Sequence, residues 1–278
     1  MAEEKDSIKG GVITMGSLFW ENGRNCLKDK NMLDSAGRIK SLELAKYRTK
    51  WRNENLIIDD AEQLQLPIRY GKKSSTRKDT YTMVFSREYL SNKCFGQIIP
   101  FKNEIDFHTN GILEKQARKM ATAEGIIDTN GNVFFVMDWC TMAIWINPTL
   151  PHDKNLRNEW LLIVNNPNNY FRYKKNRNNN IPSNTPRYAT DYSGNNDAVL
   201  LSNNFELIDV PIKCDFDFLL LTYTKPDSSY PDAETIAKAI NCKKSKYNTY
   251  LKKNIESKIL TCDDDKIRGF LEPSMKFN

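Results

Sequence analysis

The sequence predicts an α+β fold, in which strands and helices alternate along a chain of 278 residues. Three observations lead to this prediction. Short runs of β-branched and aromatic residues, which fit a pleated strand, recur through the chain. Between them lie segments with apolar residues at helical spacing, the clearest over residues 112–124. Clusters of glycine, proline and asparagine separate the two kinds of segment, as expected for turns.

Composition and charge are those of an ordinary globular protein. Apolar residues make up 40% and charged residues 27% of the chain, which is enough to bury a core. The net charge of +6 is modest and comes from residues spread along the chain, so it argues only weakly for a nucleic-acid partner. The charged N-terminus predicts no secretory signal, and no apolar run is long enough for a membrane span. We therefore expect a cytoplasmic protein.

Cysteine and histidine usage gives no sign of a metal site. The six cysteines stand at positions 26, 94, 140, 214, 242 and 262. Their spacing does not fit a zinc knuckle or a Cys-x-x-Cys motif, so we expect mostly reduced thiols, although the even number leaves disulfides open. Only His108 and His152 are present, which excludes a multi-histidine metal site.

The first predicted strand, Val12 to Thr14, ends in a glycine-serine break that precedes a bulky Leu-Phe-Trp run. Gly16 allows a bend or a close approach of the backbone. One interpretation is a simple bend in an N-terminal strand. The other is a small anion-binding concavity formed by the N–H groups of Gly16, Ser17 and Leu18.

The remaining elements follow from the same patterns. Further strands are predicted over residues 66–70, 80–86, 95–101, 133–146 and 216–224, and further helices over residues 36–55, 154–164, 233–240 and 245–259. Most charges of the 36–55 helix are expected to form a solvated face. Ser229 or Asp232 is the expected cap of the 233–240 helix, and the polar tail from Thr261 is expected to be loose.

Two polar segments each allow two interpretations. The basic, hydroxyl-rich residues 71–78 form either a solvated hairpin loop or a rim that meets an anionic ligand. Residues 165–196 are dense in asparagine and form either a long surface insertion or a nucleic-acid-binding segment. In the second case the basic Lys174, Lys175 and Arg177 would act with neighbouring aromatic rings.

The helix over residues 112–124 ends in an unusual way. Leu113, Ala117 and Met120 recur on one face, and the next position of that face is Glu124. Gly125 follows at once, as in many helix C-caps. The acid is either exposed by fraying of the helix end, or points inward. An inward carboxyl would have a raised pKa and would be suited to exchange protons near neutral pH.

Two short motifs, taken in order, give a resemblance to a known family. A strand that ends in Gly16-Ser17-Leu18 is followed, about 100 residues later, by a helix that ends in Glu124-Gly125-Ile126. This order resembles the gamma-glutamylcyclotransferase-like family over about residues 10–150. Met15 differs, since family members usually carry an aromatic residue there.

The resemblance implies a small, mostly antiparallel β-barrel with helices packed outside, and the strand at residues 216–224 would complete it. We expect a domain over residues 1–228, with an insertion at about residues 152–197. Residues 229–278 are expected to form a C-terminal helical extension.

The resemblance also implies an activity that needs no metal or organic cofactor. The loop from Met15 to Leu18 would bind the α-carboxylate of a gamma-glutamyl substrate through its N–H groups. Glu124 would act as general acid and base while the substrate cyclises to 5-oxoproline and releases an amine. Three residues are expected at the mouth of the pocket, namely Tyr70, Ser75 and Arg77. The alternative is a non-catalytic binding protein on the same fold, for a small ligand, a nucleic acid or a protein partner. The oligomeric state is left open.

Overall fold

The computed structural model describes most of the chain, and the statements below concern those residues. They are residues 7–21, 46–74, 81–106, 111–126, 133–136, 139–150, 153–169, 200–227, 229–241 and 247–271. The predictions that concern Ser75, Arg77 and the asparagine-rich residues 170–196 fall outside these ranges.

The centre of the molecule is a five-stranded sheet with the order β3-β6-β2-β9-β8. Its strands are β2 (Gly10–Thr14), β3 (Glu62–Gln65), β6 (Phe95–Pro100), β8 (Cys140–Ile146) and β9 (Phe218–Thr224). β2 pairs with β9 in parallel, and the other neighbours in this sheet are antiparallel. Every residue of β2 and β8 is buried, because both strands are covered on their two faces.

Smaller strand pairs flank this sheet. β1 (Ser7–Ile8) pairs with β7 (Ile105–Asp106), and β4 (Ile68–Lys73) forms a hairpin with β5 (Tyr81–Phe85). The hairpin packs against β9 through a stack of Phe85 on Tyr223, with ring centroids 5.3 Å apart. The described strands thus form an α+β fold with a mixed, mainly antiparallel sheet, and closure into a barrel stays a prediction.

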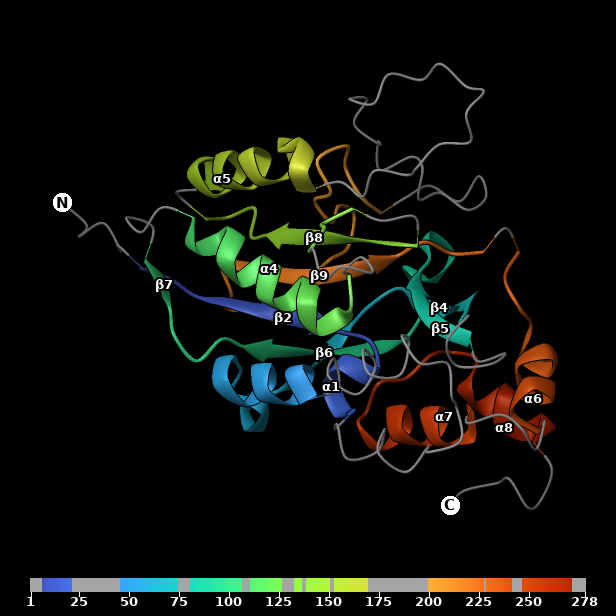
Figure 1. Cartoon of the computed structure of the whole chain (residues 1–278). Helices are drawn as coiled ribbons and strands as arrows, with labels where there is room; N and C mark the ends of the chain where they lie inside the picture. Colours follow the sequence, from blue (N-terminus) through green and yellow to red (C-terminus); the bar gives the residue numbers. More distant parts are fainter. Residues whose placement is uncertain are drawn as a thin grey trace, which may run out of the picture.

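Helices cover the sheet and its end (Figure 1). Their bounds are α1 Ser17–Trp20, α4 Ile112–Glu124, α5 Asp153–Asn165, α6 Ala233–Asn241, α7 Tyr247–Glu256 and α8 Asp264–Phe270, together with a helix over residues 46–55 and short 3₁₀ turns at Ile58–Asp60, Arg87–Tyr89 and Pro167–Asn169. α4 lies across the face of β2 and β9, while α6, α7 and α8 gather at one end of the molecule.

The helix predicted at residues 112–124 is confirmed, together with its end. Leu113, Ala117 and Met120 are fully buried, so the predicted apolar face is the one that meets the sheet. Gly125 has a φ of 79°, and its N–H bonds the carbonyls of Ala121 and Thr122. Only a residue without a side chain adopts this left-handed conformation readily, which explains why the helix ends there.

Two expectations need correction. The strand predicted over residues 133–146 is shorter, since β8 begins at Cys140. The tail after Thr261 is not loose: it forms α8, whose Ile267 is fully buried. The bulky run after Gly16, for which the sequence analysis gave no secondary structure, forms the short helix α1. The cap of α6 is Asp232, whose carboxylate accepts the N–H of Thr235 at 2.7 Å.

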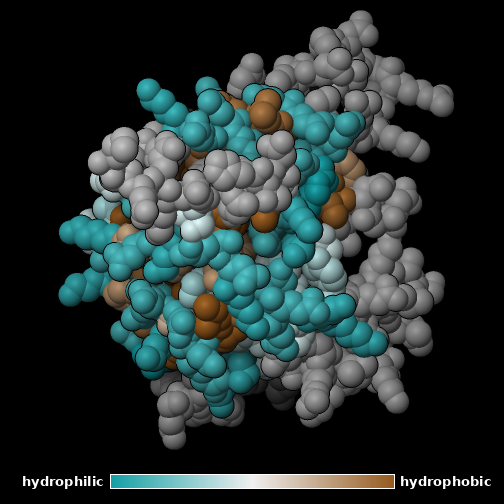
Figure 2. Space-filling view, turned by 90° about the vertical axis from the view of Figure 1, so that its left-hand side faces the viewer, coloured by the Kyte–Doolittle hydropathy of each residue, from teal (hydrophilic) through white to brown (hydrophobic). Residues whose placement is uncertain are grey.

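The surface is polar where it is visible in Figure 2, with apolar residues in small separate patches. Trp51, Trp160, Phe135 and Phe218 are among the largest side chains that are fully buried, whereas Leu162 and Phe270 are exposed. No described helix is long and apolar enough to cross a membrane.

Packing in the sheet leaves no room for a side chain at Gly10. A Cβ at this position would lie 2.2 Å from the ring of the fully buried Phe218. We therefore expect Gly10→Ala to lower the free energy of unfolding by about 1–3 kcal/mol, measured by urea denaturation. Gly269→Ala is the matched control, because a Cβ there meets nothing within 4 Å. In helix α8 this change should leave stability unchanged or raise it by up to about 1 kcal/mol. Equal effects of the two substitutions would contradict the packing described here.

Candidate functional site

The guanidinium group of Arg48 joins the two motifs that the sequence singled out. Its Nη1 donates to the hydroxyl of Ser17 at 3.3 Å and pairs with the carboxylate of Glu21. Its Nη2 lies 3.9 Å from Oε2 of Glu124. Ser17 and Glu124 therefore lie close to a single side chain, although they belong to distant parts of the sequence.

Arg48 and Arg52 also satisfy backbone carbonyls at the ends of helices. Arg48 donates through Nε to the carbonyl of Ala123 at 2.8 Å, in the last turn of α4. Arg52 donates to the carbonyls of Leu18 and Glu21 in and beside α1, both at 2.7 Å. The last carbonyls of a helix have no partner within the helix, so these arginines replace water there. The contacts fix α1 against the end of α4.

Burial makes this arrangement costly for the charges that take part. Arg48 is 6% exposed and Arg52 is 3% exposed. Burial and the neighbouring charge of Arg48 lower the pKa of Arg52 to about 10, while Glu21 and Glu124 oppose that shift. The prediction of a solvated charged face is therefore wrong for these two residues. The sequence contains one sign that the two arginines are buried. They lie four residues apart on one face of the helix, beside the buried Trp51.

The side chain of Glu124 lies between the two sequence interpretations. It is 21% exposed and is therefore partly buried, while the buried residues of α4 precede it on the helix. Cys140, the first residue of β8, lies within range of its charge: burial raises the pKa of this thiol, and Glu124 raises it further. The carboxylate thus lies between Arg48 and the beginning of a core strand.

The loop before α1 is covered by the C-terminal part of the chain. Gly16 has an extended backbone, and a Cβ at this position would lie 2.6 Å from the hydroxyl of Tyr250 in α7. Trp20 meets the ring of Tyr250 edge-on and donates its indole N–H to Asn254 at 2.8 Å. The sequence did not indicate that α7 contributes to this region, because nothing local links it to residues 15–18.

The other residues of the predicted loop face the interior. The side chain of Leu18 is buried, and that of Met15 is half-buried and packs against the core. The hydroxyl of Ser17 accepts a hydrogen bond from Arg48. Met15, Gly16 and Leu18 have no polar side chain, so any binding of an anion by these three residues would use backbone groups.

Tyr70 has a different environment from the one predicted for it. It is fully buried, and it lies near enough to Asp264 to lower the pKa of that carboxyl, instead of lining the mouth of a pocket. Asp264 accepts the N–H of Thr261 at 2.7 Å and its hydroxyl at 2.9 Å. Burial raises the pKa of Asp264 to about 6, although the bonds from Thr261 and the neighbouring Tyr70 act against this shift. This cluster joins the C-terminal segment to β4.

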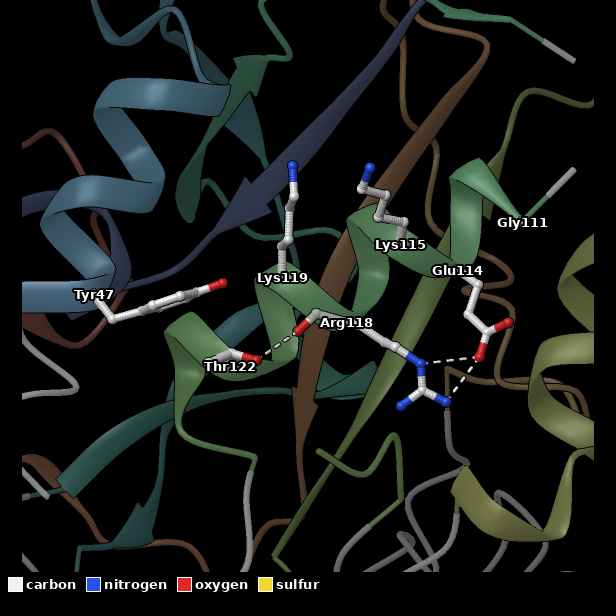
Figure 3. A pocket seen from close by; sticks show the side chains of 7 residues that line it. All are labelled: Tyr47, Gly111, Glu114, Lys115, Arg118, Lys119 and Thr122. Atoms are coloured by element: carbon white, nitrogen blue, oxygen red, sulfur yellow. Dashed lines mark hydrogen bonds and ion pairs between the residues drawn. The ribbon is translucent and has the colours of Figure 1, made fainter. Parts of the chain in front are cut away.

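A cavity of about 510 Å³ lies between the helix over residues 46–55 and the outer face of α4 (Figure 3). Seven residues line it, of which three are basic and one is acidic: Tyr47, Gly111, Glu114, Lys115, Arg118, Lys119 and Thr122. The cations do not converge, because Lys115 and Lys119 extend to one side while Arg118 turns to the carboxylate of Glu114 on the other. Thr122 lines this cavity and stands two residues before Glu124 in α4.

Within the described ranges, no group of three or more histidine, cysteine, aspartate or glutamate side chains is arranged to hold a metal ion. Comparisons with protein families, with curated proteins and with solved structures give no match to this chain. The residues around Arg48, together with the two motifs that they join, are the candidate site in the described part of the chain.

The contacts of Arg48 predict a large effect of its removal. Arg48→Ala leaves the carbonyl of Ala123 and the carboxylate of Glu21 without this buried partner. We expect the free energy of unfolding to fall by about 3 kcal/mol, measured by urea denaturation. The control is Lys50→Ala on the same helix, because the Lys50–Glu54 pair at 3.8 Å is largely exposed. This control should change stability by at most about 0.5 kcal/mol. A neutral Arg48→Ala would show that the guanidinium is not needed to hold α1 to α4.

Asp264 predicts a pH dependence of stability. Its pKa is raised in the folded state, so folding favours the protonated carboxyl. The contribution of this group should therefore fall as the pH rises from about 4 to about 6, by about 2–3 kcal/mol in total. The variant Asp264→Asn does not titrate. Urea denaturation at several pH values measures the unfolding free energy of both proteins. As the pH rises over this range, the wild type should become less stable relative to the variant. Parallel pH profiles would contradict the raised pKa.

Proposed function

We propose that this chain is a gamma-glutamylcyclotransferase-like enzyme, which converts a gamma-glutamyl group to 5-oxoproline and releases an amine. The observation that supports this proposal most is the arrangement around Arg48. One guanidinium contacts Ser17 of the first motif and lies 3.9 Å from Glu124 of the second. The family resemblance requires these two motifs to share a site.

In the proposed reaction Glu124 accepts a proton from the α-ammonium group of the substrate. The freed amine attacks the side-chain carbonyl of the same gamma-glutamyl group, which forms the C–N bond of the ring. Glu124 then gives the proton to the leaving nitrogen as its bond to the carbonyl carbon breaks. Since the attacking and attacked groups belong to one molecule, the site has only to select one conformer and transfer one proton.

The other residues of the site would position the substrate and the acid. The N–H groups of Gly16, Ser17 and Leu18, at the beginning of α1, are the proposed partners of the α-carboxylate, because the positive end of a helix favours an anion. Arg48 fixes the direction of Glu124 and joins α4 to α1. The cyclisation requires no metal ion and no organic cofactor.

The arrangement of strands agrees with the proposed family fold. β2 leads directly into the loop of the first motif and is flanked by β6 and β9. The β4–β5 hairpin packs beside β9 through Phe85 and Tyr223, where it would extend the sheet toward a barrel. We propose that residues 1–228 form this domain and that residues 229–278 are an extension of it.

Glu124→Gln tests the proposal directly. The amide keeps the shape of the side chain but cannot accept a proton, so release of 5-oxoproline should fall by about 10²–10⁴-fold. Wild type and variant are incubated with a panel of gamma-glutamyl amines and gamma-glutamyl dipeptides, and 5-oxoproline is quantified by liquid chromatography.

Glu114→Gln is the matched control, since Glu114 lies on the same helix but binds Arg118 on its outer side. This variant should keep the wild-type rate. A wild-type chain without turnover across the panel would refute the proposed reaction, and an active Glu124→Gln would refute the role of this acid.

A further inference from the structure

Two cysteines from distant parts of the chain meet where the C-terminal segment pairs with the sheet. Phe95, the first residue of β6, and Leu260 exchange two backbone hydrogen bonds of 2.7 and 2.8 Å. Cys94 stands directly before this pair and Cys262 shortly after it. The N–H of Cys262 donates to the sulfur of Cys94 at 3.2 Å.

The two thiols lie near each other. Besides the contact of its sulfur to the backbone N–H of Cys262 at 3.2 Å, Cys94 has a thiol whose pKa is raised by the neighbouring thiol of Cys262. The sulfur of Cys262 is joined to that N–H only through Cα and Cβ, so rotation of one side-chain bond changes the distance between the sulfurs. A disulfide requires the two sulfurs at about 2 Å, and we infer that rotation of the two side chains brings them together.

The surroundings give the two thiols different roles. Cys94 is fully buried, whereas Cys262 is partly exposed. Burial raises the pKa of the Cys94 thiol, and the neighbouring thiol raises it further. Since the thiolate is the reactive form, Cys262 is the thiol that a reagent in solution meets first, and Cys94 reacts afterwards from within.

We propose that Cys94 and Cys262 are a reversible redox pair, which forms a disulfide that joins the C-terminal segment to β6. The oxidant is a low-molecular-weight disulfide of the glutathione type. The thiolate of Cys262 attacks it and releases one glutathione thiol, which gives a mixed disulfide. The thiolate of Cys94 then attacks the sulfur of Cys262 and releases the second glutathione thiol. In total two protein thiols are oxidised and one glutathione disulfide is reduced.

The bond would restrain the part of the chain that covers the first motif. It closes a loop between positions separated by 168 residues. The segment held in this way begins in α7, where Tyr250 lies on Gly16 and Asn254 binds Trp20. Side-chain bonds from Gln97 to Ser257 and from Gln63 to Lys258 already place the segment on β6 and β3. The disulfide would make this placement covalent.

The test uses the full-length chain and glutathione disulfide. After incubation at pH 8, intact mass should show the loss of two hydrogen atoms, and peptide mapping without reductant should find Cys94 linked to Cys262. Dithiothreitol should reverse the change. Hydrogen exchange of the α7 amides should be slower in the oxidised chain than in the reduced one. Unchanged exchange would overturn the proposed restraint.

Single substitutions separate the two steps. Cys94→Ser should stop at the mixed disulfide and gain one glutathionyl group on Cys262, whereas Cys262→Ser should not form the bond to Cys94. Cys214→Ser is the control, because Cys214 is also a partly exposed thiol but stands in another part of the chain. It should form the disulfide at the wild-type rate. If wild type ends as the mixed disulfide, or links other cysteines instead, the proposal is refuted, and this readout needs no variant to fold.

Discussion

The region around the two motifs depends on the burial of two guanidinium groups. Moving a charge out of water costs several kcal/mol, which is recovered only where each N–H finds a partner. Arg48 and Arg52 find such partners in the carbonyls of Leu18, Glu21 and Ala123 and in the carboxylate of Glu21. α1 has only four residues and would not persist alone. Its conformation, and therefore the direction of Ser17, is set by the arginines of the neighbouring helix.

The C-terminal part of the chain packs against the sheet and against the loop that precedes α1. Residues 257–264 follow β6 and β3 through backbone and side-chain bonds, and they end in the buried Asp264, which accepts two hydrogen bonds from Thr261. These bonds lower the cost of burying the carboxyl, because they use part of its hydrogen-bonding capacity. α7, which precedes this segment, covers Gly16 with Tyr250. The C-terminal part of the chain is thus packed against the first motif.

The sequence was sufficient where a local pattern decides the structure. The period of Leu113, Ala117 and Met120 determines the buried face of α4, and Gly125 ends it because of its own backbone freedom. Prediction failed where the partner is remote. Arg48 and Arg52 look like solvated charges, since the carbonyls that they bind belong to other helices. Tyr70 was misplaced for the same reason, because its neighbour Asp264 is almost 200 residues away. α8 is short and begins with acidic residues, so it has little periodic signal.

Glu124 is the residue at which local preference and structure disagree. The C-terminus of a helix carries a partial negative charge, so a carboxylate in the last turn of α4 is unfavourable by about 0.3–1 kcal/mol. Its side chain is also mostly buried, which adds a desolvation cost. Arg48 offsets part of this cost at 3.9 Å, a distance too long for a direct hydrogen bond. An alanine would extend the apolar face of α4 without either cost. Residues that violate local rules without a gain in stability are expected at functional sites, and this argument favours Glu124 as the acid of the site more than its place in a short motif does.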